Sequence, residues 1–318
     1  MNSTTAAFLN QDVFYFAFLK NFTVVLLGVV INYMNTMLVF TFFKNQVFSD
    51  NPRYILYIHM VINDILLLTL TVSLHVLSYI FQALNVSLCC FILLIAANAT
   101  MNTPLNLAGM AIERYIAICH PLRHSQICTV RRTYILIAFI WCAGAIPRLT
   151  DLFILFATKP LSLFSSNILC YSYDVFQLPY KEEKNYATHA VYLFSVWLIL
   201  IITYFRILFA AKAAASDAAS AKKARNTILL HGAQLLLCML SYITPVIDTI
   251  MLSDFPQYRT HILFLTYLVS HIVPRILSPL IYGIRDEQLK KHMKRYILCK
   301  QIVQIRPTKE PFAKACNP

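Results

Sequence analysis

Seven apolar runs in the sequence are each long enough to cross a lipid bilayer as a helix. A spanning helix needs about 20 mostly apolar residues, because the hydrocarbon layer is about 30 Å thick and each helical residue rises 1.5 Å. The runs cover residues 22–43, 54–81, 88–118, 134–156, 187–211, 228–251 and 261–282. Within lipid every backbone polar group needs a partner inside the chain, so such runs fold as α-helices. We therefore predict an all-α membrane protein built as a seven-transmembrane helix bundle.

The composition agrees with a membrane protein and argues against a soluble enzyme. Of the 318 residues, 58% are hydrophobic and only 13% are charged, with a mean hydropathy of +0.62. Soluble domains carry roughly 25% charged residues, so this chain has too little polar surface to cover a globule in water.

The positions of Lys and Arg predict the orientation. Nineteen lie in the segments after the odd-numbered runs and in the C-terminal tail, against five on the other side. Because positive charge stays on the cytoplasmic side, we expect an extracellular N-terminus and a cytoplasmic C-terminus. The net charge of +13 then reflects topology and attraction to anionic membrane lipid, not nucleic-acid binding. We divide the chain into an extracellular tail (1–21), a helix domain (22–283) and an amphipathic helix with cytoplasmic tail (284–318).

Two positions in the terminal segments are candidate modification sites. Asn2 begins an Asn-Ser-Thr acceptor sequence in the predicted extracellular tail, where glycosylation is expected. In residues 285–298 apolar side chains recur about every four residues, and basic side chains lie between them. This spacing predicts a short amphipathic helix on the membrane surface. Cys299 follows that helix and is a candidate for palmitoylation, with an unmodified thiol as the alternative.

Glu113, Arg114 and Tyr115 lie where the third run meets a predicted cytoplasmic loop. An acidic residue beside an Arg at a helix end can hold the Arg until a competing acceptor arrives, which suits a two-state switch. The alternative is that Arg114 only extends to the membrane interface, as basic residues commonly do.

Asp64 and Arg275 are charged residues inside predicted membrane helices. Such charges are costly in lipid unless they are paired, so each is a candidate functional residue. We hypothesise that the two form an ion pair. Arg275, Ser278 and Tyr282 share a helix face through their spacings of three and four residues. The alternative is that Arg275 faces a water-filled cavity or a backbone carbonyl.

Four segments in order along the chain resemble the odorant receptors of the rhodopsin-like G-protein-coupled family. Their sequences are most similar to those of the fish-type receptors. They are NPRYILYIHMVINDILL from Asn51, MAIERYIAICHPLRH from Met110, KARNTILLHGAQLLLCMLSYI from Lys223 and PRILSPLIYGIRDEQLKKHMKR from Pro274. The resemblance covers nearly the whole chain and implies a receptor that binds a small odorant and activates a heterotrimeric, stimulatory G protein of the olfactory type.

The chain departs from the family pattern at identifiable positions. Ser278 replaces the usual Asn of the Asn-Pro-x-x-Tyr motif, which continues here with Pro279 and ends at Tyr282. The resemblance gives these three residues, with the Glu113–Tyr115 segment, a role in G-protein coupling. It also pairs Cys89 with Cys170 in a disulfide, although the adjacent Cys90 is a rival partner for Cys170.

The resemblance places the ligand among the outer halves of the third, fifth, sixth and seventh helices. The implied pocket residues are Ala97, Thr100, Met101, Tyr242, Asp248, Thr249, Tyr267 and His271. The alternative for each is ordinary packing between helices, and only as a set do they outline a small apolar cavity with a few polar anchors.

Rival functions lack the sequence features they need. A membrane transporter of small solutes is the main alternative, but the internal repeats and paired broken helices of such folds are not evident. The nine histidines are scattered and suggest no metal site, so we expect no metal, no cofactor and no enzymatic activity. The expected partners are a small-molecule odorant, a heterotrimeric G protein and lipid, in the plasma membrane.

Overall fold

The computed structural model describes residues 3–80, 83–168, 170, 181–213, 236, 244, 247–248, 250–277 and 287–297. Its helices are α1 (Ser3–Lys44), α2 (Gln46–Ser49), α3 (Pro52–Ile80), α4 (Val86–Cys119), α5 (Pro121–Ile127), α6 (Val130–Thr158), α8 (Lys181–Ala213), α10 (Arg259–Tyr267) and α12 (Glu287–Ile297). Single helical turns are η1 (Leu161–Ser165), η2 (Pro256–Tyr258) and η3 (Leu268–Ile272), the last with π-helical hydrogen bonding. Two short strands, β1 (Leu84–Asn85) and β2 (Asn167–Ile168), pair antiparallel.

Five helices in the described part of the chain are long and apolar enough to cross a membrane. They are Phe18–Lys44, Pro52–Leu77, Val86–Cys119, Val130–Thr158 and Ala187–Ala210, and a shorter apolar helix covers His261–Leu277. Each coincides with a predicted run to within a few residues. The remaining run, 228–251, lies mostly outside the described residues.

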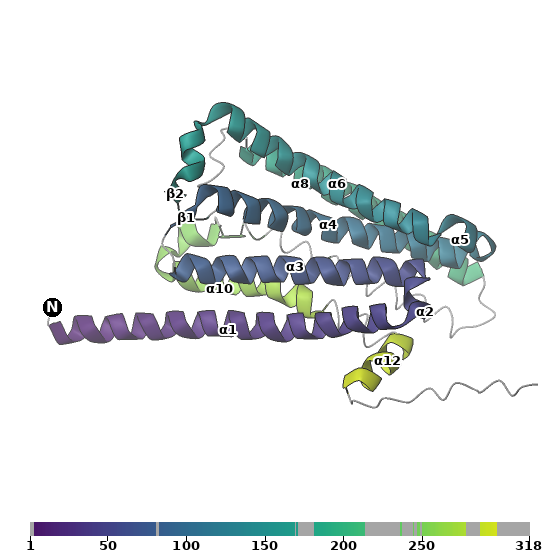
Figure 1. Ribbon diagram of the computed structural model, residues 1–318, viewed down its shortest axis with the longest axis horizontal. Coiled ribbons are helices and arrows are strands. Elements are labelled where there is room, and N and C mark those ends of the chain that lie inside the picture. The colour runs from purple at the N-terminus through teal and green to yellow at the C-terminus, as the bar shows by residue number, and fades with distance from the viewer. Residues whose placement is uncertain are drawn as a thin grey trace, which may run out of the picture.

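The first helix starts earlier than the apolar run that predicts it. α1 begins at Ser3, whereas the run begins at Phe22. No Gly or Pro precedes Gly28, so nothing in this segment interrupts the backbone hydrogen bonds of a helix. Figure 1 shows the N-terminal part of α1 projecting beyond the neighbouring helices.

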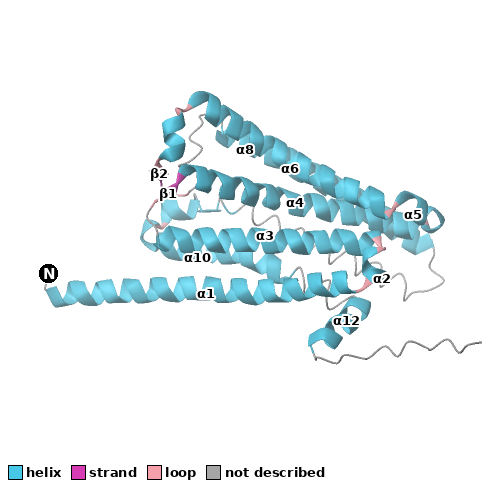
Figure 2. Cartoon of the chain, viewed as in Figure 1, coloured by secondary structure: helices cyan, strands magenta, loops and turns pink. Residues whose placement is uncertain are grey.

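α4 is the central helix of the bundle and packs against α3, α6 and α8, while α1 packs against α3. Figure 1 shows these helices running roughly alongside one another. The strand pair lies at one end (Figure 2), together with the disulfide between Cys89 and Cys170. We call this the disulfide end. The opposite end of α4 carries Glu113 and Arg114, and we call it the Arg114 end.

Polar and apolar residues are distributed as expected for a bundle in lipid. Large apolar side chains point outward, including Phe139 (68% exposed) and Phe194 (69%), whereas Asn63, Asn102 and Asn106 are at most 1% exposed. A water-soluble protein would bury the first group and expose the second. The outer surface of the bundle therefore suits contact with hydrocarbon.

A buried hydrogen-bond network joins α3, α4 and α6. The Trp141 indole donates to Nε2 of His59 (2.8 Å), and Nδ1 of His59 lies 3.2 Å from Oδ1 of Asn106. Nε2 must accept from the indole, so the ring carries its proton on Nδ1 and donates it to Asn106. Asn106 in turn donates to the Leu56 carbonyl (3.0 Å). Both nitrogens of His59 are thereby satisfied by one neutral tautomer.

Pro147 interrupts the hydrogen bonding of α6, and α8 supplies the missing partners. Proline has no N–H, so the carbonyl of Ala143 receives no bond from the residue four positions later. The Tyr192 hydroxyl of α8 donates to that carbonyl. Lys184 of α8 donates to the Pro147 carbonyl (2.8 Å) and to Asp151 (2.6 Å). These contacts join α6 to α8 near the disulfide end.

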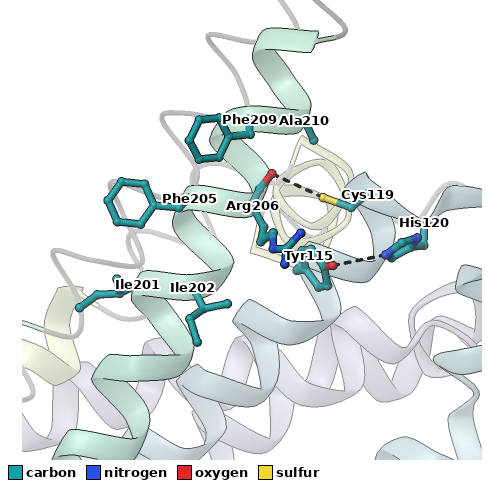
Figure 3. A pocket seen from close by; sticks show the side chains of 9 residues that line it. All are labelled: Tyr115, Cys119, His120, Ile201, Ile202, Phe205, Arg206, Phe209 and Ala210. Atoms are coloured by element: carbon teal, nitrogen blue, oxygen red, sulfur yellow. Dashed lines mark hydrogen bonds between the residues drawn. The ribbon is translucent and has the colours of Figure 1, made fainter.

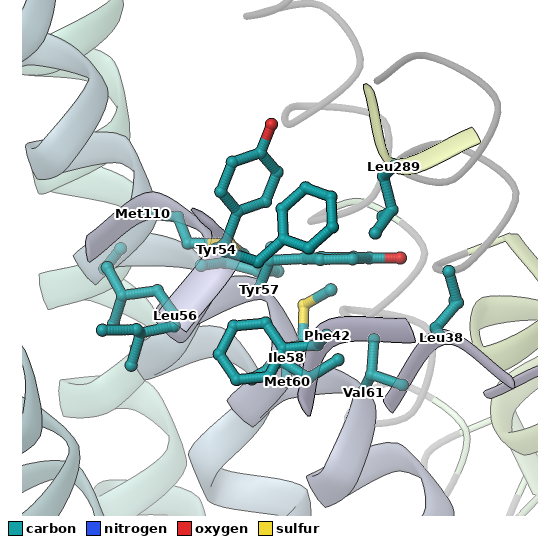
Figure 4. Packing of buried hydrophobic residues seen from close by; sticks show 14 of the residues in the cluster. Leu38, Phe42, Tyr54, Leu56, Tyr57, Ile58, Met60, Val61, Met110 and Leu289 are labelled. Carbon is teal, nitrogen blue, oxygen red and sulfur yellow. The ribbon is translucent and has the colours of Figure 1, made fainter. Parts of the chain in front are cut away.

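An apolar cluster fills the space between α1, α3 and α4 toward the Arg114 end (Figure 4). α12 closes this cluster, because Leu289 is 2% exposed within it and the ring of His292 lies edge-on to Phe48 at 5.2 Å. Basic side chains, including Lys290 and Lys294, lie on the same helix. The predicted amphipathic helix is confirmed at residues 287–297.

Candidate functional site

Glu113 is the buried centre of a charged cluster at the Arg114 end. Its residue is 6% exposed; Oε1 lies 3.0 Å from Nε2 of His124, and Oε2 lies 3.8 Å from Nε of Arg114. Only the first distance is within hydrogen-bonding range, so the contact between Glu113 and Arg114 is mainly a charge attraction. A buried carboxylate needs such partners, because its desolvation is otherwise costly.

The local fold of the second predicted cytoplasmic loop brings His124 to Glu113. Pro121 occupies the first turn of α5, where its missing N–H costs nothing. One further turn along α5 places His124 against the end of α4. The same short helix leaves Cys128 near Glu113 and Arg132. Burial raises the pKa of the Cys128 thiol, the Glu113 charge raises it further, and Arg132 opposes both effects.

A cavity of about 880 Å³ opens between the end of α4 and α8 (Figure 3). Within it, Tyr115 lies 3.3 Å from His120 through its hydroxyl, and the Cys119 thiol lies 3.8 Å from the Arg206 carbonyl. Figure 3 shows Arg206 on the side of α8 that faces Tyr115. The wall combines aromatic and aliphatic side chains with at least one cation. Its lining includes Tyr115, Cys119, His120, Phe205, Arg206 and Phe209.

Asp64 of α3 and Arg275 lie next to each other deep in the bundle. Nε of Arg275 is 3.7 Å from Oδ1 of Asp64, and the two residues are 3% and 2% exposed. Arg275 also donates to the Ser270 carbonyl (3.4 Å). The structure therefore combines the hypothesised charge pair with the backbone contact that was its alternative.

The disulfide between Cys89 and Cys170 is confirmed, with Cα atoms 5.6 Å apart, and the rival Cys90 is free and buried. Cys89 lies in the first turn of α4, and Cys170 lies two residues after β2, in the loop that follows α6. The paired strands hold this loop against α4 through Leu84 opposite Ile168 and Asn85 opposite Asn167. Two-residue strands were not expected in a fold predicted to be all-α.

The structure brings only some of the predicted ligand residues together. Tyr267 and His271 are ring neighbours at 5.3 Å, and His75 of α3 stacks on Tyr267 at 5.4 Å. Nδ1 of His271 is buried without a hydrogen-bond partner among the described residues, whereas the Tyr267 hydroxyl lies next to the Thr71 side chain. The ring nitrogen of His271 is therefore left available to a polar ligand.

The other predicted ligand residues are less clearly placed. The Thr100 hydroxyl donates to the Ala96 carbonyl (2.9 Å) within α4, and Met101 is 1% exposed. Ala97 is partly buried on the same helix, and Asp248 faces Thr266. Several predicted residues lie outside the described part of the chain, namely Asn2, Tyr242, Thr249, Ser278, Pro279, Tyr282 and Cys299.

Sequence reasoning missed several residues that the structure places at these sites. His124 ends the MAIERYIAICHPLRH segment, and its spacing of eleven residues from Glu113 does not predict their contact unless the position of α5 is known. His75 is a single polar residue in an apolar run, and nothing in the sequence predicts that it stacks on Tyr267. Arg206 is one of the nineteen basic residues that predict the orientation, and nothing in the sequence places it in the cavity beside Tyr115, where it lies.

Comparison with known proteins now assigns the class. Residues 34–282 match the family described as 7 transmembrane receptor (rhodopsin family). The chain therefore belongs to the rhodopsin family of seven-transmembrane receptors, which are receptors and not enzymes. The match confirms the seven-helix bundle and decides against a solute transporter.

Within that family, odorant receptors are among the proteins similar to this chain. Odorant receptor 131-2 of Danio rerio is 31% identical over 282 residues, which cover 88% of this chain and 86% of the relative. Olfactory receptor 51E1 of Homo sapiens is 29% identical over 201 residues, covering 59% of this chain and 60% of that receptor. Olfactory receptor 10P1 of Homo sapiens is 26% identical over 229 residues, with 69% and 65% covered.

Proposed function

We propose that this receptor binds a small odorant in the half of the bundle nearest the disulfide and activates a stimulatory, olfactory-type G protein at the Arg114 end. The observation that carries the proposal is the arrangement of Glu113, Arg114 and Tyr115 on one helix end beside a cavity of about 880 Å³. The similarity to odorant receptors supports the class of ligand.

The disulfide end then faces the exterior. Disulfides persist in oxidising compartments, and the excess of Lys and Arg falls on the other side of the membrane. Asn2 would be glycosylated outside, and Cys299 is a candidate for palmitoylation inside. Basic residues of α12, such as Lys290 and Lys294, would lie against anionic lipid while Leu289 anchors the helix to the bundle.

The cavity at the Arg114 end suits the C-terminal helix of a G-protein α subunit. Such a helix presents apolar side chains to a groove and carries negative partial charge at its C-terminus. Phe205 and Phe209 offer apolar contacts, and Arg206 offers positive charge. Arg114 would add its guanidinium once it leaves Glu113, and the differential affinity of an agonist for the two states would supply the shift.

The ligand would reach the seventh helix at Tyr267 and His271. The buried ring nitrogen of His271 needs a partner, and a small molecule with a polar group meets that need. With Ala97, Thr100 and Met101 on α4, and with Tyr242, Asp248 and Thr249 on the sixth helix, they form the proposed pocket.

A cyclic-AMP reporter assay tests the coupling. Cells would express the chain with an olfactory-type G protein and be screened with amino acids, bile acids, short carboxylic acids and aldehydes. We expect a response that disappears in Arg114→Ala at unchanged surface level. Arg123→Ala removes an exposed cation from the neighbouring α5 and serves as the matched control.

Glu113→Gln gives a second, independent readout. Removing the negative charge weakens the attraction of this position for Arg114 and His124, so basal cyclic AMP should rise without agonist. A well-displayed receptor that stays silent across the panel, with no rise in Glu113→Gln, would contradict the proposed coupling.

A further inference from the structure

Among the described residues, His124 is the nearest charged or titratable partner of the buried Glu113 carboxylate. Nε2 of His124 lies 3.0 Å from Oε1, whereas Nε of Arg114 lies 3.8 Å from Oε2. The side chain of His124 is 27% exposed and that of Glu113 only 7%. The imidazole therefore connects a buried carboxylate to the solvent at the Arg114 end, from which it can take up a proton.

The backbone around His124 is held from the α6 side. The N–H of Cys128 donates to the His124 carbonyl (2.8 Å) and closes the last turn of α5. Arg132 of α6 donates through Nη1 to the carbonyls of Gln126 (2.9 Å) and Ile127 (3.2 Å). These bonds join the end of α5 to the start of α6. A movement of the Arg114 side chain on α4 breaks none of them, so His124 can stay against Glu113 when Arg114 leaves.

A protonated His124 and Arg114 are like charges on one carboxylate, each beside a different oxygen. While Arg114 is paired with Glu113, its charge opposes protonation of the imidazole. Once Arg114 leaves, that repulsion is gone, and the buried carboxylate needs the remaining cation more. We call this the released state.

The sign of the pH dependence follows from this difference between the two states. Because the imidazole binds a proton more tightly in the released state, the proton in turn favours that state. Lowering the pH therefore shifts the receptor toward the released state, and raising the pH shifts it back toward the paired state.

Other charged or titratable groups near this end do not replace His124. In the described part of the chain, the elements that meet here carry Arg53, Arg114, Tyr115, His120, Arg123, Cys128, Arg131, Arg132 and Arg206. His120 contacts the Tyr115 hydroxyl instead of the carboxylate (3.3 Å). Burial and the Glu113 charge raise the pKa of the Cys128 thiol, so it stays neutral near pH 7. Guanidinium groups keep their charge, whereas histidine changes its charge near neutral pH.

We propose that His124 is a positioning residue for Glu113, which it holds in the paired and in the released state, and that protonation of His124 favours the released state. The proposal rests on the proposed coupling at the Arg114 end. It makes that coupling stronger when the cytoplasmic pH falls.

Histidine NMR tests the electrostatic part without a G protein. The receptor is labelled with isotopic histidine, reconstituted in lipid and titrated between about pH 5.5 and 8. The chain has nine histidines, and the His124 signal is the one missing from His124→Gln. Its titration midpoint should fall by about 0.5 pH unit or more in Glu113→Gln, which removes the attracting charge. It should rise in Arg114→Gln, which removes the repelling charge, and stay unchanged in the matched control His292→Gln.

Nucleotide exchange on a purified olfactory-type G protein tests the effect on coupling. The receptor is in nanodiscs without agonist, and the rate with empty nanodiscs is subtracted at each pH. The basal rate of the parent should be at least about twofold higher near pH 6.4 than near pH 7.6. His124→Gln stays neutral and should show no such ratio. His124→Lys stays charged and should be faster than His124→Gln at both pH values, whereas His292→Gln should keep the ratio of the parent.

The outcomes separate this proposal from the proposed coupling. A His124 midpoint that is equal in the parent, Glu113→Gln and Arg114→Gln would overturn it, because the imidazole charge would not be coupled to the pair. Exchange with no pH ratio in the parent, or with the same ratio in His124→Gln, would overturn it as well. Exchange that is absent from every variant, while the midpoints still shift, would instead contradict the coupling. Should Arg114→Gln fail to fold, Glu113→Gln and the exchange ratio still decide.

Discussion

The ion pair between Asp64 and Arg275 yields the sharpest energetic prediction. At 3.7 Å, two unit charges attract by about 4.5 kcal/mol if the effective dielectric constant is about 20. Removing one partner leaves the other charge buried, which costs about 3–5 kcal/mol, whereas removing both avoids that penalty. Asp64→Asn and Arg275→Gln should therefore each destabilise the receptor strongly. The double variant should be more stable than the worse single variant.

The measurement is apparent Tm in nanodiscs, with surface display in cells as a second readout. Tm falls by about 2–4 °C for each kcal/mol of lost stability, so each single variant should have a Tm roughly 10 °C lower than that of the parent. Asp64→Asn combined with Arg131→Gln is the control, because Arg131 lies at the exposed start of α6 and the two effects should add. A double variant of Asp64 and Arg275 no better than the worse single one would refute the pairing.

Three further predictions concern other parts of the bundle. Gly144→Ala should lower stability by about 1–3 kcal/mol through overpacking, measured as a shift in Tm. Gly109→Ala should cost less, because its Cβ meets only the end of a Leu side chain at 3.3 Å. Cys89→Ser should lower Tm by the equivalent of about 2–4 kcal/mol, and Cys170→Ser should add little to it; additive losses would argue against the bond. Because its pKa is raised, Cys128 should be alkylated more slowly than a free thiol at pH 7.4 and faster as the pH rises, followed by mass spectrometry of its peptide. A rate equal to that of a free thiol would contradict the buried environment.

The helices could be predicted because lipid imposes a simple rule on length and polarity, and Pro52–Ile80 and Val86–Cys119 follow it closely. The Cys89–Cys170 bond could be predicted only through resemblance, since the sequence left Cys90 as a rival. The contact of His124 with Glu113 could not be predicted, because it depends on where the short helix α5 lies against the end of α4.

Polar contacts between helices were the least predictable part of the fold. Apolar periodicity says which residues can face lipid, but it does not give the rotation of one helix against another. Gly144 shows the limit. In the sequence it is an ordinary small residue of a membrane helix. Only the packed bundle shows that the side-chain amides of Asn98 and Asn102 on α4 occupy the space that a side chain at position 144 would need.

The hydrogen bond from Tyr192 to the Ala143 carbonyl makes Pro147 and Tyr192 a single unit of evolutionary change. Losing the tyrosine hydroxyl alone would leave a carbonyl without a partner in an apolar interior. Losing the proline alone would give that carbonyl a second donor and leave the hydroxyl redundant. Among descendants of this receptor, a substitution at position 192 is therefore best tolerated after one at position 147. The order of the two substitutions follows from the missing backbone N–H of proline, because the Ala143 carbonyl needs the Tyr192 hydroxyl for as long as position 147 is proline.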